Sequence, residues 1–244
     1  ATGILVQSSE GVTLASNQIY HNLSDAGSGI RVEGSESIIL TGNQVFGNIT
    51  TGYGFGGIFL NGCSDSLLRE NQIYGNAGKL GGGASVWSSS ITTLTGNSIY
   101  SNTATTGGGI SVVGSETVTL QANHVFENGA YWGGGIYVEE SLAALTGNRI
   151  DHNQATYGGG VSLAGDAVTL TANLIRHNVA LRAGGGVHLA ASHAVLFVNN
   201  ALIGNQVGGT GRGAGIFVDL SAPVSLVHNT IAANGGGDGI GVLV

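Results

Sequence analysis

The chain repeats one sequence pattern, Asn-x-φ-x-x-Asn with φ an aliphatic residue, at a nearly constant interval. The leading asparagines of the nine copies are Asn17, Asn43, Asn71, Asn97, Asn123, Asn148, Asn173, Asn200 and Asn229. Successive copies are 26, 28, 26, 26, 25, 25, 27 and 29 residues apart. A sustained period of this length indicates a solenoid, in which each period is one structural unit that packs on its neighbours.

Each period contains three short segments in which apolar residues alternate with polar ones. In one period Ile110 and Val112 follow a glycine run, Leu120 lies three residues before Asn123, and Val125 lies two residues after it. Such alternation, in short segments rich in β-branched residues and bounded by Gly or Asn, favours strands over helices. Three short strands per period predict an all-β fold, a single-stranded parallel β-helix of nine to ten coils. The right-handed form is the favoured hand for parallel crossovers.

The corners between strands account for the 45 glycines. The run Gly-Gly-Gly stands before a strand at 81–83, 107–109, 133–135, 158–160 and 184–186. Gly tolerates positive φ and the close approach of a neighbouring backbone, which stacked tight corners require. Asn also tolerates the left-handed region and can hydrogen-bond to its own copy one coil away. The nine leading asparagines are therefore predicted to form a structural ladder.

Composition excludes several function classes. Only 9% of the residues are charged, the formal net charge is −7 and Lys79 is the one lysine, whereas nucleic-acid binding needs clustered Lys and Arg. The single cysteine, Cys63, allows no intrachain disulfide and no cysteine-based metal site, and we interpret it as a small packed corner residue. No apolar run reaches the length needed to insert directly into a membrane. No cofactor is expected.

The uninterrupted period predicts one domain over residues 1–244. The chain opens (Gly3–Val6) and closes (Gly239–Val244) on the strand that follows the glycine run, so Ile240 and Val242 are the predicted equivalents of Ile216 and Val218. Neither end carries a polar cap of the kind that solenoids use. Our hypothesis is that flanking coils of a longer chain, or head-to-tail self-association, cover the ends. The lack of Met also predicts a processed chain or a segment of a longer one.

Three stretches, IYSNTATTGGGI (99–110), VFENGAYWGGGI (125–136) and IDHNQATYGGGV (150–161), carry a family resemblance. They resemble the repeats of right-handed parallel β-helix surface proteins, including the polymorphic outer-membrane protein type of autotransporter passenger. The resemblance covers nearly the whole chain and implies extracellular or cell-surface display, with adhesion to carbohydrate or other cell-surface proteins. The chain departs from that pattern in having Gly where the family commonly has a small residue before φ, and in lacking a C-terminal membrane barrel.

Other β-helix families are enzymes that act on polysaccharides. Their signatures are the calcium-binding Asp clusters of pectate lyases, the N-T-D, D-D, G-H-G and R-I-K motifs of polygalacturonase-like hydrolases, and the D-P-H motif of alginate epimerase-like enzymes. None of these motifs occurs in this sequence.

Three outward-facing groups remain as candidate sites. The first is an aromatic column one residue beyond the buried aliphatic of each motif, which is a platform for sugar rings or a partner, or else ordinary cross-strand stabilisation. Its members are Tyr20, Phe46, Tyr74, Tyr100 and Phe126.

The second group is Glu127, His152 and His177, at equivalent positions of three consecutive coils. These residue types can bind a metal or form an acid/base pair. Short loops predict no deep cleft there, and Asp151 next to Arg176 is interpreted as a surface ion pair. We therefore expect no metal, and keep the three residues only as an alternative catalytic set.

The third group lies in the variable corners before the glycine runs, where solenoids commonly place binding sites. Tyr131, Trp132, Tyr157 and Arg182, with Arg212 nearby, are candidates for stacking on a saccharide. The alternative is that these side chains only shield the glycine corner from water.

The favoured interpretation is a non-catalytic extracellular or cell-surface scaffold or adhesion segment. One alternative is a structural subunit that assembles end to end. The other is a polysaccharide-active enzyme of the lyase, hydrolase or epimerase type.

Overall fold

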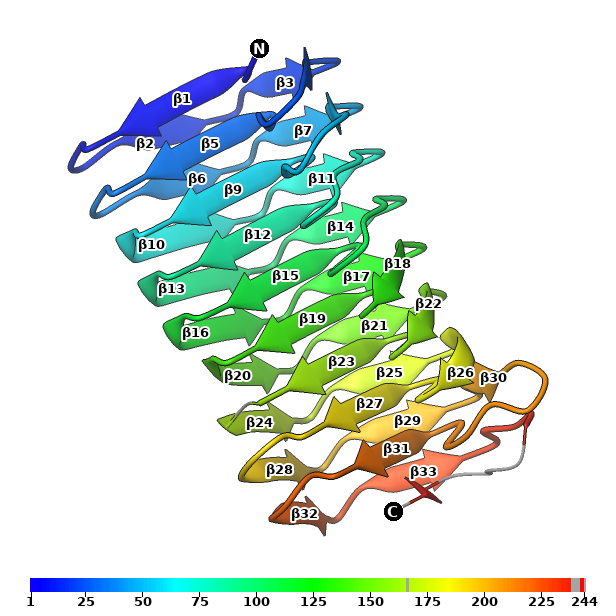
Figure 1. The fold of residues 1–244 in the computed structure, drawn as a ribbon. Coiled ribbons are helices and arrows are strands. Elements are labelled where there is room, and N and C mark those ends of the chain that lie inside the picture. The colour runs from blue at the N-terminus through cyan, green and yellow to red at the C-terminus, as the bar shows by residue number, and fades with distance from the viewer. Residues whose placement is uncertain (166, 238–241, 244) are drawn as a thin grey trace.

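The computed structural model describes residues 1–165, 167–237 and 242–243. Its strands stack into an elongated solenoid whose three long sheets run from one end to the other (Figure 1). All strand pairs are parallel, and each strand pairs with its equivalents in the coils before and after, as Ile73, Ile99 and Val125 show. None of the described residues is helical, so this part of the chain offers no helix for crossing a membrane. The predicted all-β fold with three strands per coil is confirmed.

The strands are grouped by sheet, in spatial order. Sheet A contains β1 (Ile4–Gln7), β5 (Ile30–Glu33), β9 (Ile58–Asn61), β12 (Ala84–Trp87), β15 (Ile110–Val113), β19 (Ile136–Glu139), β23 (Val161–Ala164), β27 (Val187–Ala190), β31 (Ile216–Asp219) and β34 (Val242–Leu243). Sheet B contains β2 (Thr13–Ala15), β6 (Ile39–Thr41), β10 (Ser64–Arg69), β13 (Ser90–Thr95), β16 (Glu116–Gln121), β20 (Leu142–Thr146), β24 (Ala167–Thr171), β28 (Val195–Val198) and β32 (Val224–Val227). Sheet C contains β3 (Gln18–Tyr20), β7 (Gln44–Phe46), β11 (Gln72–Tyr74), β14 (Ser98–Tyr100), β17 (His124–Phe126), β21 (Arg149–Asp151), β25 (Leu174–Arg176), β29 (Ala201–Ile203) and β33 (Thr230–Ala232).

Two further short sheets lie at the corner between sheets C and A and were not predicted. Sheet D contains β18 (Gly129–Trp132), β22 (Gln154–Tyr157), β26 (Val179–Ala183) and β30 (Gln206–Val207), and a pair is formed by β4 (Leu23–Ser24) and β8 (Ile49–Thr50). Figure 1 shows sheet D as a separate column of strands along one flank of the rod. These strands form where the corner segment is extended enough to pair with its copy one coil on.

The predicted register fails at the last strand of sheet A. Ile216 pairs with Val242, and Phe217 pairs with Leu243, whereas the repeat pattern aligned Val242 with Val218. The other half of that prediction, Ile240, lies outside the described residues.

The interior of the solenoid is filled by the predicted aliphatic columns. Ile99, Ile110 and Leu120, one from each long sheet, have no solvent exposure. Stacking identical or similar aliphatic residues at strand spacing keeps the core continuous from coil to coil.

The asparagine ladders hold the corners on either side of sheet C. Asn128, for example, donates from its amide to the carbonyl of Ile99 and to Oδ1 of Asn153, and its own Oδ1 accepts from the main-chain N–H and amide of Asn102. Each such side chain therefore connects three coils. The predicted hydrogen bonds between copies are confirmed.

The left-handed backbone, however, is not at the asparagines. The residue before each of the eighteen motif asparagines has a φ between 52° and 65°, and the asparagine that follows turns its side chain into the buried ladder. Glu127, His152 and His177 are such left-handed corner residues, with φ of 55°, 57° and 52°. His is one of the non-glycine residue types tolerated there, which gives this column a backbone reason for its composition.

The glycine runs are required where one coil approaches the next. A Cβ on Gly134 would lie 2.4 Å from the carbonyl oxygen of Gln154 and 2.6 Å from that of Gly159, and Gly133 has a φ of 62°. The middle glycine thus lets adjacent corners touch backbone to backbone, as predicted.

Sheet A differs from the expected strand with one buried face. The corner segments fold over its outer surface, so that outward-facing Phe59, Tyr137 and His188 are at most 7% exposed. Where small residues stand in this column, as at Ser85 and Ser111, the side chains are fully covered as well. The solenoid therefore has a second, thinner packed layer outside sheet A.

Cys63 occupies a column of serines at the corner between sheets A and B. Its main-chain N–H donates to Oγ of Ser89 at 3.1 Å, and the same bond recurs from Ser89 to Ser115. The side chain is 2% exposed, and burial raises the pKa of the thiol. The interpretation of Cys63 as a small packed residue is confirmed.

Candidate functional site

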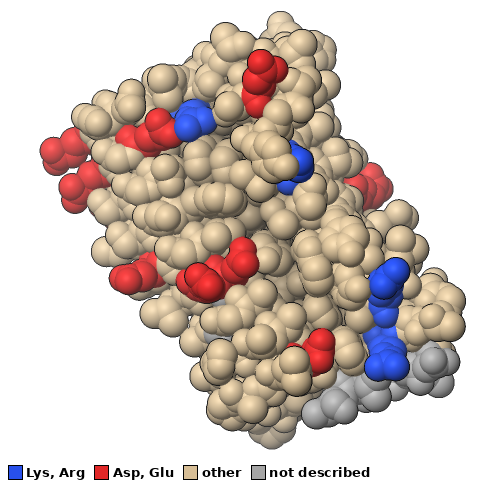
Figure 2. Space-filling view, in the orientation of Figure 1, with Lys and Arg blue, Asp and Glu red and all other residues tan. Residues whose placement is uncertain are grey.

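A groove of about 820 Å³ opens beside sheet D in the C-terminal half of the solenoid. Its lining includes Tyr157, Arg182, Arg212, Phe217 and Asp219, together with the glycine-rich segment 208–211. Figure 2 shows basic side chains gathered on this flank of the rod, over sheet D. A volume of this size lies within the range of small-molecule binding sites.

A longer corner makes the wall of this groove. Ile216 follows Asn205 by 11 positions, whereas Val161 follows Asn153 by only 8. The main-chain N–H of Arg212 donates to the carbonyl of Arg182 at 2.8 Å, so the two arginines lie on adjacent coils. Neither guanidinium forms an ion pair or a hydrogen bond with any described residue. Two arginines without an ion-pair partner, against the one carboxylate of Asp219 in the same lining, give the groove a net positive charge that favours an anion.

Aromatic rings continue from the groove onto the outer surface of sheet A. The rings of Trp132 and Tyr157 stack with centroids 4.3 Å apart, as their equivalent positions predicted, and Tyr131 is 46% exposed beside them. Tyr157 lies 5.4 Å from the ring of His188, which lies 5.7 Å from Phe217. The rings therefore cover the corner, which was the alternative interpretation, while Tyr157 also lines the groove.

His188 is the buried group beneath these rings. It is 2% exposed, and its Nδ1 has no hydrogen-bond partner. Burial lowers the pKa of this imidazole to about 4, against the opposing effect of the Asp219 carboxylate. His188 is therefore neutral at physiological pH.

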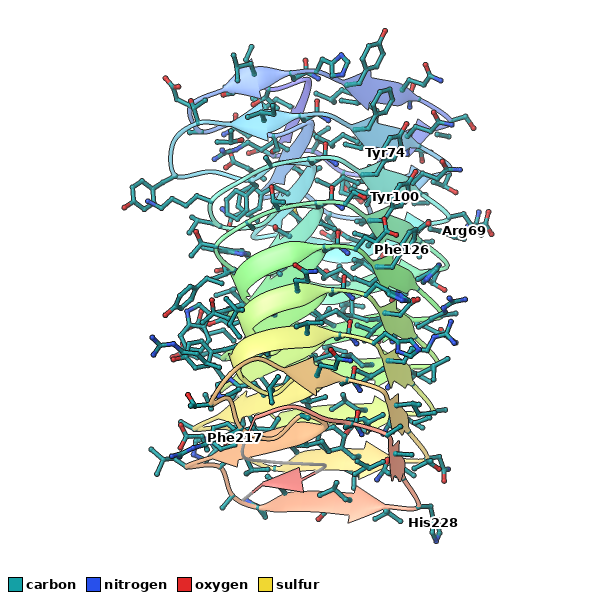
Figure 3. The ribbon with its side chains drawn as sticks, turned by 90° about the vertical axis from the view of Figure 1, so that its right-hand side faces the viewer. Arg69, Tyr74, Tyr100, Phe126, Phe217 and His228 are labelled. Atoms are coloured by element: carbon teal, nitrogen blue, oxygen red, sulfur yellow. The ribbon has the colours of Figure 1, made fainter. Side chains whose placement is uncertain are left out.

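The aromatic column of sheet C is formed as predicted. The rings of Tyr20, Phe46, Tyr74, Tyr100 and Phe126 stack in sequence with centroids 4.8 to 4.9 Å apart and planes within 11° of parallel. Tyr20 is half exposed. Figure 3 shows Tyr74, Tyr100 and Phe126 in one column and Phe217 on the opposite side of the view. The ring column and the corner groove thus lie on different faces.

At the next coil the column changes from a ring to the carboxylate of Asp151, which pairs with Phe126 across the strands. The Asp151 side chain is only 4% exposed and contacts Arg149, His124 and His152. Arg149 Nε and Nη2 lie 3.0 and 3.1 Å from its two oxygens, His124 Nε2 lies at 2.7 Å, and His152 Nδ1 lies at 3.0 Å. Burial alone raises the pKa of this carboxyl, but the hydrogen bonds from Arg149, His124 and His152 outweigh burial and hold it below its usual value.

The predicted contact between Asp151 and Arg176 is present, with Arg176 Nη2 4.0 Å from Asp151 Oδ2, but its placement on the surface is wrong. The Asp151 carboxylate is buried, and its nearest basic atom is Nε2 of His124 at 2.7 Å, on the coil before. The long side chains of β21 and its neighbours reach across the strand and enclose the carboxylate, which strand alternation alone does not reveal.

The alternative catalytic set is not brought together as a group. Glu127, His152 and His177 are all exposed. The Glu127 carboxylate lies 3.5 Å from the hydroxyl of Ser101, on the coil before. The rings of His152 and His177 do approach each other, with centroids 5.3 Å apart.

Five residues at these sites were not singled out from the sequence: His188, Phe217 and Asp219 near the groove, and His124 and Arg149 around Asp151. His188 and Phe217 pair across β27 and β31 at the outward position of sheet A, which was expected to face solvent. The available signal was two aromatic residues on successive coils, in a column that also holds Phe59 and Tyr137 among the serines Ser85, Ser111 and Ser162.

Comparison with solved structures finds low-identity likenesses. The periplasmic alginate epimerase AlgG is 11% identical with a TM-score of 0.46, over 100% of this chain and 79% of that one. PfbA, a surface adhesin of Streptococcus pneumoniae, is 11% identical with a TM-score of 0.41, over 92% of this chain and 60% of that one. QnrB1, a plasmid-mediated fluoroquinolone resistance protein, is 10% identical with a TM-score of 0.33, over 91% of each chain. Likeness at this level does not extend to activity.

Two comparisons by sequence were made, with curated proteins and with protein families, and the second identifies the family of this chain. No curated protein matches the chain, and the narrower resemblance to polymorphic outer-membrane protein passengers stays a prediction. The family described as the right handed beta helix region matches residues 2–174, which is most of the chain and agrees with the parallel coils of the structure. The protein belongs to the right-handed beta helix family.

Proposed function

We propose that this protein is a non-catalytic β-helix segment that binds an anionic saccharide in the corner groove. The observation that carries the proposal is that Arg182 and Arg212, neither with an ion-pair partner, lie in one groove with the rings of Tyr157 and Phe217. Guanidinium groups match the geometry of carboxylate and sulfate groups, and ring faces such as that of Tyr157 offer a stacking surface for a sugar. We infer an extracellular or cell-surface location, because a chain with few charges and many Gly, Asn, Ser and Thr residues suits that setting.

The groove favours a charged saccharide over a neutral one. The protein carries 14 acidic and 7 Lys or Arg residues, so long-range attraction does not draw anions to it. A local pair of arginines must provide that recognition. Asp219 on the same groove can accept a hydroxyl hydrogen bond, which favours a ligand with both anionic groups and hydroxyl groups.

Isothermal titration calorimetry with short uronic-acid oligomers tests the proposal. We expect the wild-type protein to bind galacturonate or guluronate oligomers and not neutral glucose oligomers of the same length. The double variant Arg182→Ala/Arg212→Ala should lose at least tenfold in affinity, because truncating residues that bind charged groups costs about 1.5–3 kcal/mol for each such hydrogen bond. Arg69→Ala is the matched control, since Arg69 is exposed in β10 of sheet B, away from the groove.

Two results would contradict the proposal. One is equal affinity for charged and neutral oligomers, and the other is unchanged affinity in the double variant. Release of new reducing ends or unsaturated products from the bound oligomers would instead support the enzyme alternative.

A further inference from the structure

We propose that His152 and His177 bind one divalent transition-metal ion, such as Zn²⁺, Ni²⁺ or Cu²⁺, on the outer corner between sheets C and D. This site is separate from the saccharide groove. It lies where two imidazoles from successive coils face each other with their ring centroids 5.3 Å apart.

The separation of the rings fits a shared ion. Zinc–nitrogen bonds are about 2.0–2.1 Å long, and a ring centre lies about 1.1 Å beyond the nitrogen, so two imidazoles at a tetrahedral angle have centres about 5 Å apart. The left-handed backbone at both residues, with φ of 57° and 52°, projects the two side chains from the corner in the same direction. The ladder of asparagines that follows keeps these corners in register, through Asn153 and Asn178.

Asp151 prepares His152 as a ligand. The carboxylate lies 3.0 Å from Nδ1 of His152 and accepts its hydrogen, which leaves Nε2 with a free lone pair. A carboxylate behind a ligating imidazole is the usual outer-sphere arrangement, since it fixes the tautomer and the ring orientation and makes the ligand more basic. Asp151 is itself held by Arg149 and His124, so the support is rigid.

The local charge permits a cation. Arg149 Nε lies 3.0 Å and Arg176 Nη2 lies 4.0 Å from the Asp151 carboxylate, and Glu127 adds a second carboxylate to this corner of the solenoid, so acidic and basic side chains are equal in number. Glu127 occupies the equivalent corner one coil before His152, pointing toward Ser101. No group of three or more His, Cys, Asp or Glu side chains able to hold a metal is found within the described ranges, so the proposed site has two protein ligands and water completes the coordination.

Calorimetric titration of the purified protein with ZnCl₂ and with NiCl₂ in a non-chelating buffer tests the site. We expect one ion per chain, and a loss of at least tenfold in affinity for both His152→Ala and His177→Ala. Asp151 contacts His124, Arg149, His152 and Arg176 and not His177, so His177→Ala leaves the carboxylate cluster intact. Asp151→Asn should weaken binding about 10- to 100-fold while both ligands remain. His21→Ala is the matched control, because His21 occupies the same left-handed corner of the first coil and stacks over Gly47 instead of another imidazole.

Electron paramagnetic resonance of the Cu²⁺-loaded protein gives an independent readout. The wild type should show two nitrogen ligands, and His177→Ala should show one. No binding of Zn²⁺ or Ni²⁺ at millimolar concentration would overturn the proposal, as would affinity unchanged in both histidine variants or a greater loss in His21→Ala than in either of them.

Discussion

The buried asparagine columns and the outer columns of the same coils follow different rules. The asparagine that begins each motif is the same from the first coil to the last, and each internal copy bonds to the coil on either side. The outer column of sheet C changes from five stacked rings to a buried carboxylate at Asp151, and that of sheet A mixes serines with Phe59, Tyr137, His188 and Phe217. Another residue type at one position of an asparagine ladder leaves buried polar groups unpaired in two coils. An outer residue needs only a compatible neighbour. Repetition is therefore imposed by the interior, and the candidate sites arise where the exterior departs from it.

We expect the largest loss of stability from a substitution in a buried asparagine ladder. Asn128→Ala removes four side-chain hydrogen bonds and leaves the buried main-chain N–H and one amide hydrogen of Asn102 without an acceptor. We expect a loss of about 3 kcal/mol or more in the free energy of unfolding, at about 1–3 kcal/mol for each stranded group. Urea denaturation measures it. Asn17→Ala is the matched control, because Asn17 is partly exposed and its side chain makes one such bond. Equal losses in the two variants would remove the distinction between interior and exterior.

The burial of His188 in the outer column of sheet A should make the stability of the protein depend on pH. His188 has a folded pKa of about 4, below the ordinary value for an unfolded histidine, about 6.5. The unfolded chain therefore binds the proton first, so stability falls as the pH drops from about 6.5 to about 4 and this dependence ends below that. The loss is on the order of 3 kcal/mol. Urea denaturation of wild type and His188→Phe at pH 7 and pH 4.5 measures it, and the variant should lack this component. The same pH dependence in both proteins would show that this column is not sealed.

The smallest effect is expected at Asp151. Its folded pKa is lowered, so its stabilising contribution is present above the ordinary aspartate pKa of about 3.9 and is lost as the pH falls through the lower folded value. We expect Asp151→Asn to cost about 1–2 kcal/mol at pH 7, since its partners are partly exposed and lose little when unpaired. The difference between variant and wild type should shrink near pH 3. Thermal unfolding at both pH values measures it, and a difference independent of pH would mean that charge at Asp151 does not matter.

The candidate sites were only partly visible in the sequence. The aromatic column and the pairing of Trp132 with Tyr157 follow from equal positions in the repeat, because in-register parallel pairing places equal positions side by side. Arg182 was also visible as a member of a variable corner. The enclosure of Asp151 was not visible in the sequence, because it depends on the direction in which the side chains of Arg149 and His124 extend across the strands.

The sequence by itself determined what lies above and below each residue. A period of about 26 residues specifies the coil, the aliphatic core and the asparagine ladders, since these depend only on stacking identical positions along one axis. The tertiary structure alone decided what lies beside each residue around a corner. The path of the corner segments buries the outer face of sheet A and brings the two arginines to one groove, and the directions of the His124 and Arg149 side chains enclose Asp151. Contacts of this kind depend on loop length and side-chain direction, which no period encodes.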